Sequence, residues 1–567
     1  MISILKQIIE CVPNFSEGRN MDVIKQITDE IEKVSGITLL DVDPGQATNR
    51  TVVTFVGEPD AVLEAAFQAV KKAGEVIDMR HHKGEHPRMG ATDVLPLVPV
   101  SNITLEQTAE LARKLGKRIG DELGIPVFAY ESAAIKPERK NLAVCRRGEY
   151  EGLKKRFEEG DNADFGPKVF DDRVAQTGAT ACGARDFLIA VNYNLNTTST
   201  RRANAIAFDV REKGRPKREG NPITGKIMLD ENGKQIFIPG TLKGCKAIGW
   251  YIEEYKIAQV SMNITDIKTT SLHRAFEEVC RAAGSRGVRV TGTEIVGLVP
   301  KNVLLDAAKY FLEKQQRSVG ISEEELIFIA IKSLGLDDLK PFNPKEKVIE
   351  YLMESTDQKR LIDLTCKGFA EETASESPAP GGGSIAAYAG ALGAALGTMV
   401  ANLSSHKAGW DDKWKYFSDV AAEGQKVMAH LLHLVDEDTN AFNKIMDVFA
   451  MPKATDADKA ARAKAMEEAT LYATQIPLET MKASLEVFPI VKLMAKEGNP
   501  NSVSDAGVGA LVARAAVQGA FLNVKINASG LKDRQVADKL IAEATEIAAK
   551  ADAFEKEVVD ICNGIIK

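Results

Sequence analysis

ITLLDVDPGQATNRTVVTFVGEPDAVLEAAFQAVKKAGEV, residues 37–76, places two strand-like runs directly before a helix-like run. The runs at 37–42 and 51–56 are rich in β-branched and aromatic residues, and apolar residues recur at helical spacing from 60 to 76. The flanking sequence supplies the other elements of this unit: strands at 8–12, 94–100 and 127–130, and helices at 21–34 and 104–123. The order strand, helix, strand, strand, helix, strand predicts the split βαβ arrangement of ferredoxin-like domains.

A second unit with the same order of elements follows the first. Its strands are expected at 187–193, 246–251, 258–263 and 288–296, and its helices at 198–210, 272–283 and 302–313. Each half should therefore form one sheet with helices on one face. A basic, glycine-rich excursion from Lys213 to Lys243 interrupts the second unit. Within it, IMLDENGKQIFI predicts either a β-hairpin that turns at Asn232-Gly233 or a mobile loop.

The composition of the chain changes near Lys340. KPFNPKEK, residues 340–347, carries two prolines and three lysines, which is typical of a domain boundary. Strand signals then nearly vanish, and helical patterns follow at 357–373, 384–404, 411–449, 457–486 and 532–565. We therefore predict an α/β part of two ferredoxin-like split βαβ subdomains, 1–185 and 186–338, a linker at 339–356, and an all-α helical domain at 357–567.

Bulk composition narrows the class of protein further. The 567 residues are too many for one hydrophobic core, and contents of 44% hydrophobic and 27% charged residues are ordinary for globular protein. The net charge of −7 argues against a nucleic-acid partner, and seven scattered cysteines without a CxxC motif indicate reduced thiols in the cytoplasm. The N-terminal run is a poor signal peptide, and the weakly polar run from Ala389 to Leu403 is too short to span a membrane.

The segment RHHKGEHPRMG, residues 80–90, concentrates three of the seven histidines of the chain: His81, His82 and His86. Gly84 and Pro87 break any helix here, so we expect a shaped loop, and loops often carry catalytic groups. Histidine also titrates near neutral pH, as proton transfer requires. Two alternatives are a solvated basic turn and a zinc site, since two of these histidines are four residues apart.

In the helical half, Asp438 is a carboxylate on an apolar helix face. At about 100° per residue, seven apolar residues fall within about 60° of it: Val427, Leu431, Leu434, Val435, Phe442, Ile445 and Phe449. Asp436 falls nearly opposite, and Glu437 falls to one side. Because burying an unpaired charge is costly, Asp438 is predicted to serve either a function or a structural cap.

Two polar loops of the helical half are candidates for ligand contact. SPAPGGGS, residues 377–384, leads into an alanine-rich helix and leaves backbone N–H groups open at a partly positive helix end. The alternative is an entry turn with Ser384 as N-cap. GNPNSVSDAG, residues 498–507, separates two helices. Its polar side chains, together with those of NVKIN at 523–527, could form hydrogen bonds to the edge of a heterocycle or could merely cap helices.

Several of these segments together resemble the formimidoyltransferase-cyclodeaminase family. The matching motifs are ECVPNFSEGRN (10–20), LLDVDPGQATNRTVVTFVG (39–57), IDMRHHKGEHPRMGATDV (77–94), DFGP (164–167), KAIGWYIEEYKIAQVSMN (246–263) and SPAPGGGS (377–384). They occur in the family's order along nearly the whole chain. Two features depart from the family: the loop 167–178 is longer than usual, and 213–240 resembles an insertion.

The resemblance implies a bifunctional folate enzyme of histidine degradation and one-carbon metabolism. The first half would transfer the formimino group of N-formimino-L-glutamate to tetrahydrofolate, which gives 5-formiminotetrahydrofolate and glutamate. The second half would convert that product to 5,10-methenyltetrahydrofolate and ammonia. Tetrahydrofolate, with one or several glutamates, is then a substrate, and no metal is expected. Further copies of the chain, as a dimer or a higher ring, are the expected protein partners.

The resemblance also implies roles for single residues. His86 would be the catalytic residue of the transferase, Asp43 a neighbour that holds its imidazole, and Asp438 the carboxylate of the cyclodeaminase. Both substrates carry carboxylates, which Arg50, Lys83 and Arg88 could clamp. The full set of expected substrate and folate contacts is Arg50, His82, Lys83, Arg88, Gly166, Pro167, Gly178, Gly240, Thr241, Leu242, Gly381, Gly382, Gly383, Ser384, Asp505 and Asn523.

Two other functions stay open at this point. The helical half could act as a methenyltetrahydrofolate cyclohydrolase, which an assay of ammonia release from formiminotetrahydrofolate would distinguish. Alternatively, the chain could be a folate-binding or scaffold protein without catalysis, although the joint presence of His86, Asp43 and Asp438 argues against that.

Overall fold

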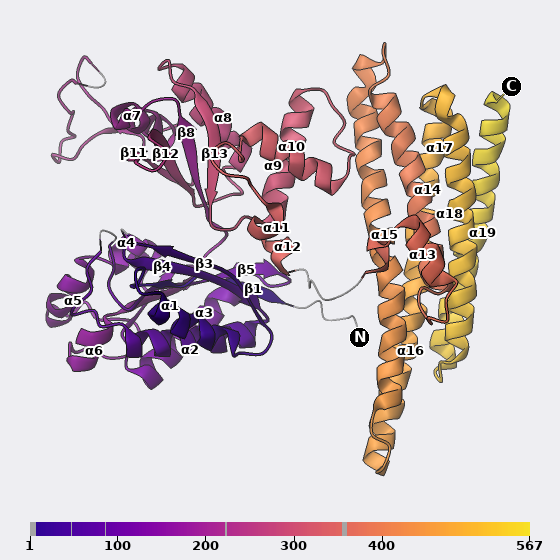
Figure 1. The fold of residues 1–567 in the computed structure, drawn as a ribbon, viewed down its shortest axis with the longest axis horizontal. Coiled ribbons are helices and arrows are strands. Elements are labelled where there is room, and N and C mark those ends of the chain that lie inside the picture. The colour runs from indigo at the N-terminus through magenta and orange to yellow at the C-terminus, as the bar shows by residue number, and fades with distance from the viewer. Residues whose placement is uncertain (1–6, 47, 85–86, 222–223, 354–359, 567) are drawn as a thin grey trace. The chain divides into compact units, whose positions relative to one another are not determined.

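The computed structural model describes residues 7–46, 48–84, 87–221, 224–353 and 360–566. These residues divide into two compact units: Met1–Leu304 with Leu334–Glu354, and Leu305–Ser333 with Ser355–Lys567. The three sheets of the described residues belong to the first unit, and the longest helices belong to the second (Figure 1). The predicted fold class, an α/β part followed by an all-α part, is confirmed.

The first sheet has seven strands: β1 Ile8–Cys11, β2 Asn14–Phe15, β3 Ile37–Gly45, β4 Arg50–Gly57, β5 Thr92–Ser101, β6 Val127–Glu131 and β7 Thr180–Ala184. β1 lies between β4 and β5 and is antiparallel to both, and β3 pairs with the outer edge of β4. In the split βαβ pattern the first strand lies between the third and the last. Here, with the short β2 left aside, β1 is the first strand, β4 the third and β5 the last, so the pattern is present. β2 continues the line of β1 between the same two neighbours.

Two further strands extend this sheet beyond β5. β7 pairs with β5 and β6, and both pairings are parallel. The sequence predicted β6 but neither β7, whose residues TACGA have little β propensity, nor the short helices that precede it. These helices are η1 Pro137–Lys140, α4 Leu142–Cys145, α5 Glu149–Glu158 and α6 Asp172–Thr177.

Helices cover one face of this sheet: α1 Met21–Glu32, α2 Pro59–Val76 and α3 Leu105–Leu123 (Figure 1). Ile9 and Cys11 of β1 are fully buried in the core against these helices. Because side chains alternate along a strand, Glu10 and Val12 point to the opposite face. That second face carries the polar groups of the cavity described below.

The second sheet has the order β11–β12–β8–β13, and all its pairings are antiparallel. Its strands are β8 Ile189–Leu195, β11 Cys245–Ile252, β12 Ile257–Ile264 and β13 Val290–Val296, and its helices are α7 Thr200–Val210 and α8 Leu272–Gly284. The first strand again lies between the third and the last, so the second predicted split βαβ unit is confirmed as well.

The excursion after α7 contains the short strands β9 Arg215–Pro216 and β10 Phe237–Ile238. The chain reverses between Asp230 and Lys234, whose backbone groups are hydrogen-bonded at 2.8 Å, and Gly233 has φ +73°. The predicted reversal at Asn232-Gly233 is therefore present, with Leu229 bridged to Gln235.

Residues from 301 to 353 add four helices: α9 Lys301–Lys314, α10 Glu323–Leu334, α11 Pro344–Lys347 and α12 Ile349–Met353. The last two lie in the segment that the sequence predicts as a linker. Val348, between them, is fully buried, and its backbone pairs with that of Val299. Residues 334–353 therefore pack into the first unit, whereas 305–333, with most of α9 and α10, belong to the second unit. The division of the chain at 338 stays a prediction.

The second unit is dominated by a bundle of long helices (Figure 1). They are α14 Gly382–Ser405, α15 Trp414–Ala450, α16 Asp456–Leu485, α17 Val487–Glu497, α18 Val503–Ser529 and α19 Arg534–Ile565, preceded by η2 Leu361–Asp363 and α13 Cys366–Thr373, with η3 Asp411–Lys413 and η4 Pro500–Ser502 between them. Small residues let the helices approach closely: a Cβ at Gly393 would lie 2.9 Å from the carbonyl oxygen of Gly509. The prediction that Phe449 lies on the core-facing side of α15 is wrong, since this residue, near the end of the helix, is 58% exposed.

Two bundle segments, Gly382–Ser405 and Pro500–Ser529, are long and apolar enough to cross a membrane by length and composition alone. In their most apolar windows, 61% and 44% of the residues are buried inside the bundle. A buried core helix satisfies the same criteria, so the absence of a membrane partner stays a prediction.

Candidate functional sites

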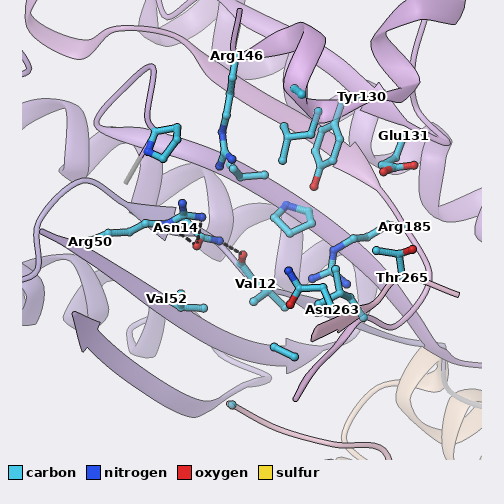
Figure 2. A pocket seen from close by; sticks show the side chains of 18 of the residues that line it. Val12, Asn14, Arg50, Val52, Tyr130, Glu131, Arg146, Arg185, Asn263 and Thr265 are labelled. Carbon is cyan, nitrogen blue, oxygen red and sulfur yellow. Dashed lines mark hydrogen bonds between the residues drawn. The ribbon is translucent and has the colours of Figure 1, made fainter. Parts of the chain in front are cut away.

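The first unit contains a cavity of about 1030 Å³ (Figure 2). Its lining comes from the helix-free face of the first sheet, from the loop after β6, and from the strands of the second sheet. The two subdomains therefore form this site together, which explains why candidate residues lie far apart in the sequence.

Charged side chains dominate the polar lining of this cavity. The acidic residues are Glu10, Asp41, Asp43, Glu131, Glu149 and Glu151, and the basic ones are Arg50, Arg146, Arg147, Arg185 and Lys246. In Figure 2, the side chains of Arg50, Arg146 and Arg185 extend from different elements toward the same space. Such a mixture suits a substrate that carries carboxylates and also needs proton transfer.

Arg50, at the start of β4, is fixed at the wall of the cavity. Its Nε donates to Oδ1 of Asn14 at 2.8 Å, and its Nη1 lies 3.6 Å from Oδ2 of Asp93. Asp93 is fully buried and also pairs with Arg146. Burial lowers the pKa of Arg50 to about 10, against the opposing effect of Asp93. The guanidinium therefore stays cationic at neutral pH.

Glu10 is a buried carboxyl group on the cavity side of β1, with 4% of the residue exposed. Burial raises its pKa to about 7, Arg185 opposes the shift, and Glu350 adds to it. Burial also raises the pKa of Asp41 and of Glu131, which line the same cavity. The cavity thus holds one acid, Glu10, that can carry a proton near neutral pH, and two others whose pKa burial raises.

Asp43, on β3, lines this cavity and also an adjoining one of about 350 Å³. The residue expected to work with it, His86, lies outside the described residues, as does Glu85. Pro87, which follows them in the sequence, lines the main cavity. The pairing of Asp43 with His86 stays a prediction.

His82 and Arg88 form the base of the histidine loop, and neither is among the residues that line the main cavity. The Nε2–H of His82 donates to the carbonyl oxygen of Asn49 at 2.9 Å, and its Nδ1 accepts from Nε of Arg88 at 3.3 Å. Because a carbonyl only accepts and a guanidinium only donates, these bonds require the neutral ring with its proton on Nε2. Burial lowers the pKa of His82, and the charge of Arg88 lowers it further. The hydrogen bond to the backbone of Asn49 opposes both effects.

The two other expected carboxylate clamps differ in their surroundings. Arg88 donates to both oxygens of Glu151, at 2.7 and 2.8 Å, and to Glu149 at 3.4 Å. Lys83 is exposed, and its carbonyl oxygen accepts from Nδ2 of Asn49 at 2.9 Å. Of the three predicted clamps, Arg50 alone lines the main cavity among the described residues.

The expected folate segments of the first unit lie outside the residues that line the cavity. Gly166 has φ +82°, and a Cβ there would lie 2.6 Å from the carbonyl oxygen of Ile125; Pro167 follows it. Gly178 has φ +65° and packs in the same way against the carbonyl oxygen of Met89. In the segment Gly240 to Leu242, the N–H groups of Thr241 and Leu242 bond to the end of α7. These contacts give the glycines a structural role, and folate binding there stays a prediction.

In the helical unit, Asp438 of α15 lies against the start of α14. The Oγ of Ser384 donates to its Oδ2 at 3.0 Å. Burial raises the pKa of Asp438, and the hydrogen bonds from the side chain and backbone of Ser384 oppose the rise. The structure therefore brings together a carboxylate and a glycine-rich turn that the sequence indicated separately.

Two more predicted residues of the helical unit are on α18. Asn523 lies beside the same turn, since a Cβ at Gly382 would be 3.4 Å from its Nδ2. Asp505 is at the other end of the helix, about 27 Å away along its axis at 1.5 Å per residue. The bundle thus brings Asn523, but not Asp505, to Asp438.

Several residues of the cavity were not singled out in the sequence: Glu10, Asn14, Tyr130, Arg146, Arg185, Lys246 and Asn263. The available signal was a charged or amide side chain inside a strand, as in IIEC at 8–11. Among the described residues, no group of three or more His, Cys, Asp or Glu is placed to hold a metal ion.

Comparisons with known proteins agree with this division into a two-subdomain transferase fold and a helical unit. Family models match residues 8–185 (formiminotransferase domain, N-terminal subdomain), 190–354 (formiminotransferase domain) and 365–546 (formiminotransferase-cyclodeaminase). Such a chain is of the class that joins a formiminotransferase to a cyclodeaminase. It belongs to the formimidoyltransferase-cyclodeaminase family.

Three relatives match different shares of the chain. The formimidoyltransferase-cyclodeaminase of Gallus gallus is 41% identical over 96% of this chain and 98% of its own length. The glutamate formimidoyltransferase of Streptococcus pyogenes serotype M1 is 42% identical over 54% of this chain and 94% of its own length. The methenyltetrahydrofolate cyclohydrolase of Methylorubrum extorquens is 37% identical over 35% of this chain and 94% of its own length.

Proposed function

We propose that the first unit transfers the formimino group of N-formimino-L-glutamate to tetrahydrofolate. The folate nitrogen attacks the formimino carbon and loses a proton, and the bond from that carbon to the glutamate nitrogen breaks as the nitrogen is protonated. The products are 5-formiminotetrahydrofolate and glutamate. The single observation that carries this proposal is the cavity shared by the two subdomains, with cations for carboxylates and acids for protons on its walls.

We assign the proton transfers of this reaction to His86, which can act first as base and then as acid. Asp43 would orient its imidazole and stabilise the charged form. Arg50 would bind a substrate carboxylate, with His82, Lys83 and Arg88 in supporting contacts around the loop. Support comes from the position of Asp43 and Pro87 on the cavity wall. The folate contacts at Gly166, Pro167, Gly178 and Gly240 to Leu242 are part of the same proposal.

The second unit is proposed to convert 5-formiminotetrahydrofolate to 5,10-methenyltetrahydrofolate. A second folate nitrogen attacks the formimino carbon, and the former imino nitrogen leaves as ammonia after protonation. Asp438 would supply that proton, and its raised pKa supports this role. Gly381 to Ser384 and Asn523 would contact the folate, and Asp505 is the member of the expected set that lies farthest from them. Neither step requires a metal ion.

A second candidate for the helical unit is methenyltetrahydrofolate cyclohydrolase activity, because a relative with that name is 37% identical to this chain over 196 residues. One experiment tests both proposals. The protein is incubated with N-formimino-L-glutamate and tetrahydrofolate, and methenyl absorbance and ammonia are followed together. Equal yields of methenyltetrahydrofolate and ammonia support the two-step function. If no ammonia is released and methenyltetrahydrofolate supplied in a separate incubation is hydrolysed, the cyclohydrolase is supported.

We also propose that copies of the chain associate through the helical unit. Large apolar side chains stay exposed along two neighbouring helices, α14 and α18: Ile385, Leu392, Met399, Leu403, Val508, Leu511, Leu522 and Ile526. An exposed apolar patch of this kind marks an interaction surface. Leu522→Lys with Ile526→Lys should lower the mass measured by sedimentation, whereas an unchanged mass would exclude this face as the interface.

The remaining parts of the proposal concern substrates and location. Tetrahydrofolate would be bound as a substrate, with a single glutamate or a polyglutamate tail, in histidine degradation and one-carbon metabolism. We place the enzyme in the cytoplasm, without a nucleic-acid, membrane or metal partner. Subdomains at 1–185 and 186–338, a linker at 339–356 and a cyclodeaminase domain at 357–567 describe its proposed organisation.

A further inference from the structure

The carboxyl group of Asp438 caps a helix to which it does not belong. α14 begins after Gly381, which has no side chain to serve as an N-cap. Asp438 takes that place from α15, because its carboxyl group accepts hydrogen bonds from both the side chain and the backbone N–H of Ser384. Ser384 is fully buried, so these bonds are shielded from water. The first turn of α14 therefore fixes the carboxyl group.

Gly383 leaves the space that this arrangement needs. A Cβ at this position would lie 2.1 Å from Oδ1 and 2.6 Å from Oδ2 of Asp438. Real Cβ contacts do not occur at such distances, so any side chain at 383 would displace the carboxyl group. By contrast, a Cβ at Gly519 of the facing helix α18 would meet its nearest atom, the Cβ of Ala386, at 3.4 Å. At position 383 the need for glycine therefore comes from the contact with Asp438.

The charged groups near Asp438 on the packed helices have other partners. On α15, Asp436 accepts from the N–H of Leu361 at 2.6 Å, and Glu437 accepts from the hydroxyl of Tyr472 on α16. On α18, the amine of Lys525 lies 4.3 Å from the centre of the Phe521 ring. The first turn of α14 carries no acidic residue. Ser384 is therefore the group that acts directly on the carboxyl of Asp438.

We propose that Gly383 and Ser384 are positioning residues that set the orientation of Asp438 for proton transfer to the leaving ammonia. This inference rests on the proposed role of Asp438 in the second reaction. Since Ser384 donates to Oδ2, that oxygen is held as an acceptor, and Oδ1 carries the proton that departs with ammonia. The glycine-rich turn thus acts on the acid in addition to any contact with folate.

The test is cyclodeamination of supplied 5-formiminotetrahydrofolate by the full chain, measured across pH. Ser384→Ala should lower kcat and move the ionisation of Asp438 in the kcat profile upward by about one pH unit, since it removes a hydrogen bond to a charged group. Gly383→Ala should lower kcat by about 100-fold, as a displaced catalytic group does. The KM for the folate should change little in Ser384→Ala. Helicity and cooperative thermal unfolding, measured by circular dichroism, show for each variant that the helical unit is folded.

Matched controls come from the same bundle. Ser484→Ala removes another fully buried hydroxyl, which has no hydrogen-bond partner among the described residues, and Gly519→Ala adds a methyl group where space exists. Both should retain the wild-type pH profile. A Ser384→Ala variant with a raised KM and an unchanged pH profile would overturn the inference, because Ser384 would then serve folate alone.

The variant Asp438→Asn separates this inference from its premise. If Asp438→Asn keeps its activity, the proposed proton donor is wrong and the inference falls with it. If Asp438→Asn is inactive while Ser384→Ala behaves like the wild type, only the positioning role is refuted. In the expected case, the double variant Ser384→Ala with Asp438→Asn has nearly the same kcat as Asp438→Asn alone, because both changes remove the same interaction.

Discussion

Arg50 and Asp93 form an ion pair at the wall of the cavity, with 3.6 Å between Nη1 and Oδ2. Asp93 is fully buried and pairs with Arg146 as well. A buried carboxylate that holds two guanidinium groups is preorganised, so their positions do not have to be fixed when a substrate binds. This pair links the stability of the first sheet to the proposed recognition of an anionic substrate by Arg50.

Arg50→Gln should weaken the binding of N-formimino-L-glutamate. Loss of one charged hydrogen bond corresponds to about 1.5–3 kcal/mol, so the KM should rise by about 10- to 100-fold, with a smaller change in kcat. Arg201→Gln, on an exposed arginine outside the cavity lining, is the matched control. An unchanged KM in Arg50→Gln would show that Arg50 serves the fold alone.

His86→Ala should abolish formimino transfer and leave cyclodeamination of supplied 5-formiminotetrahydrofolate nearly intact. General acid–base catalysis contributes about 10²–10⁴-fold, so the transferase rate should fall at least 100-fold. The two activities are measured on the same preparation, which makes each the control of the other. Near-full transferase activity would contradict the assignment of His86.

The order of elements was predictable because each split βαβ unit is built from strongly patterned local segments. The strands β3 and β4 were predicted from the β-branched and aromatic residues at 37–42 and 51–56, and the helix α2 from the helical spacing of apolar residues at 60–76. β7 was missed because its small residues become a strand only through parallel pairing with β5 and β6, which lie far away in sequence. Such pairing depends on tertiary packing, which no local pattern records.

Asp438→Asn should stop the second reaction and leave the first. The amide keeps the size of the side chain but cannot deliver a proton, so cyclodeamination should fall by at least about 100-fold. Incubation with N-formimino-L-glutamate and tetrahydrofolate should then accumulate 5-formiminotetrahydrofolate. Ammonia release at the wild-type rate would show that Asp438 only caps α14.

The candidate site was predictable only in part, for a geometric reason. Helical periodicity alone places Asp438 on an inward face, and a glycine run marks a helix start, so Asp438 and Ser384 could both be named. Glu10 could not, because the face that a strand residue takes depends on register, and a shift of one residue reverses it. Arg185 could not, because it follows β7, which the sequence did not predict. The neutral state of His82 depends on Asn49 and Arg88, which only the folded loop brings together.

Glu10→Gln should stabilise the first unit at neutral and higher pH. The folded pKa of Glu10 is about 7, above its ordinary value of 4.5 because of burial, so the folded state holds this proton more tightly than the unfolded state. Wild-type stability should therefore decrease as the pH rises from 4.5 to 7, by about 3 kcal/mol from this group. Glutamine does not ionise, so the variant does not lose this stability as the pH rises. Relative to the wild type, the free energy of unfolding of the variant should rise by that amount between pH 4.5 and pH 8.

The measurement for Glu10 is denaturant unfolding of the α/β half, followed at several pH values for wild type and variant. Glu32→Gln is the matched control, because Glu32 is exposed at the end of α1. That variant gives the effect of removing an exposed carboxyl group from the same unit, with which Glu10→Gln is compared. If the difference between Glu10→Gln and wild type varies with pH no more than that of the control, Glu10 titrates as an ordinary carboxylate and cannot hold a proton in the cavity at neutral pH.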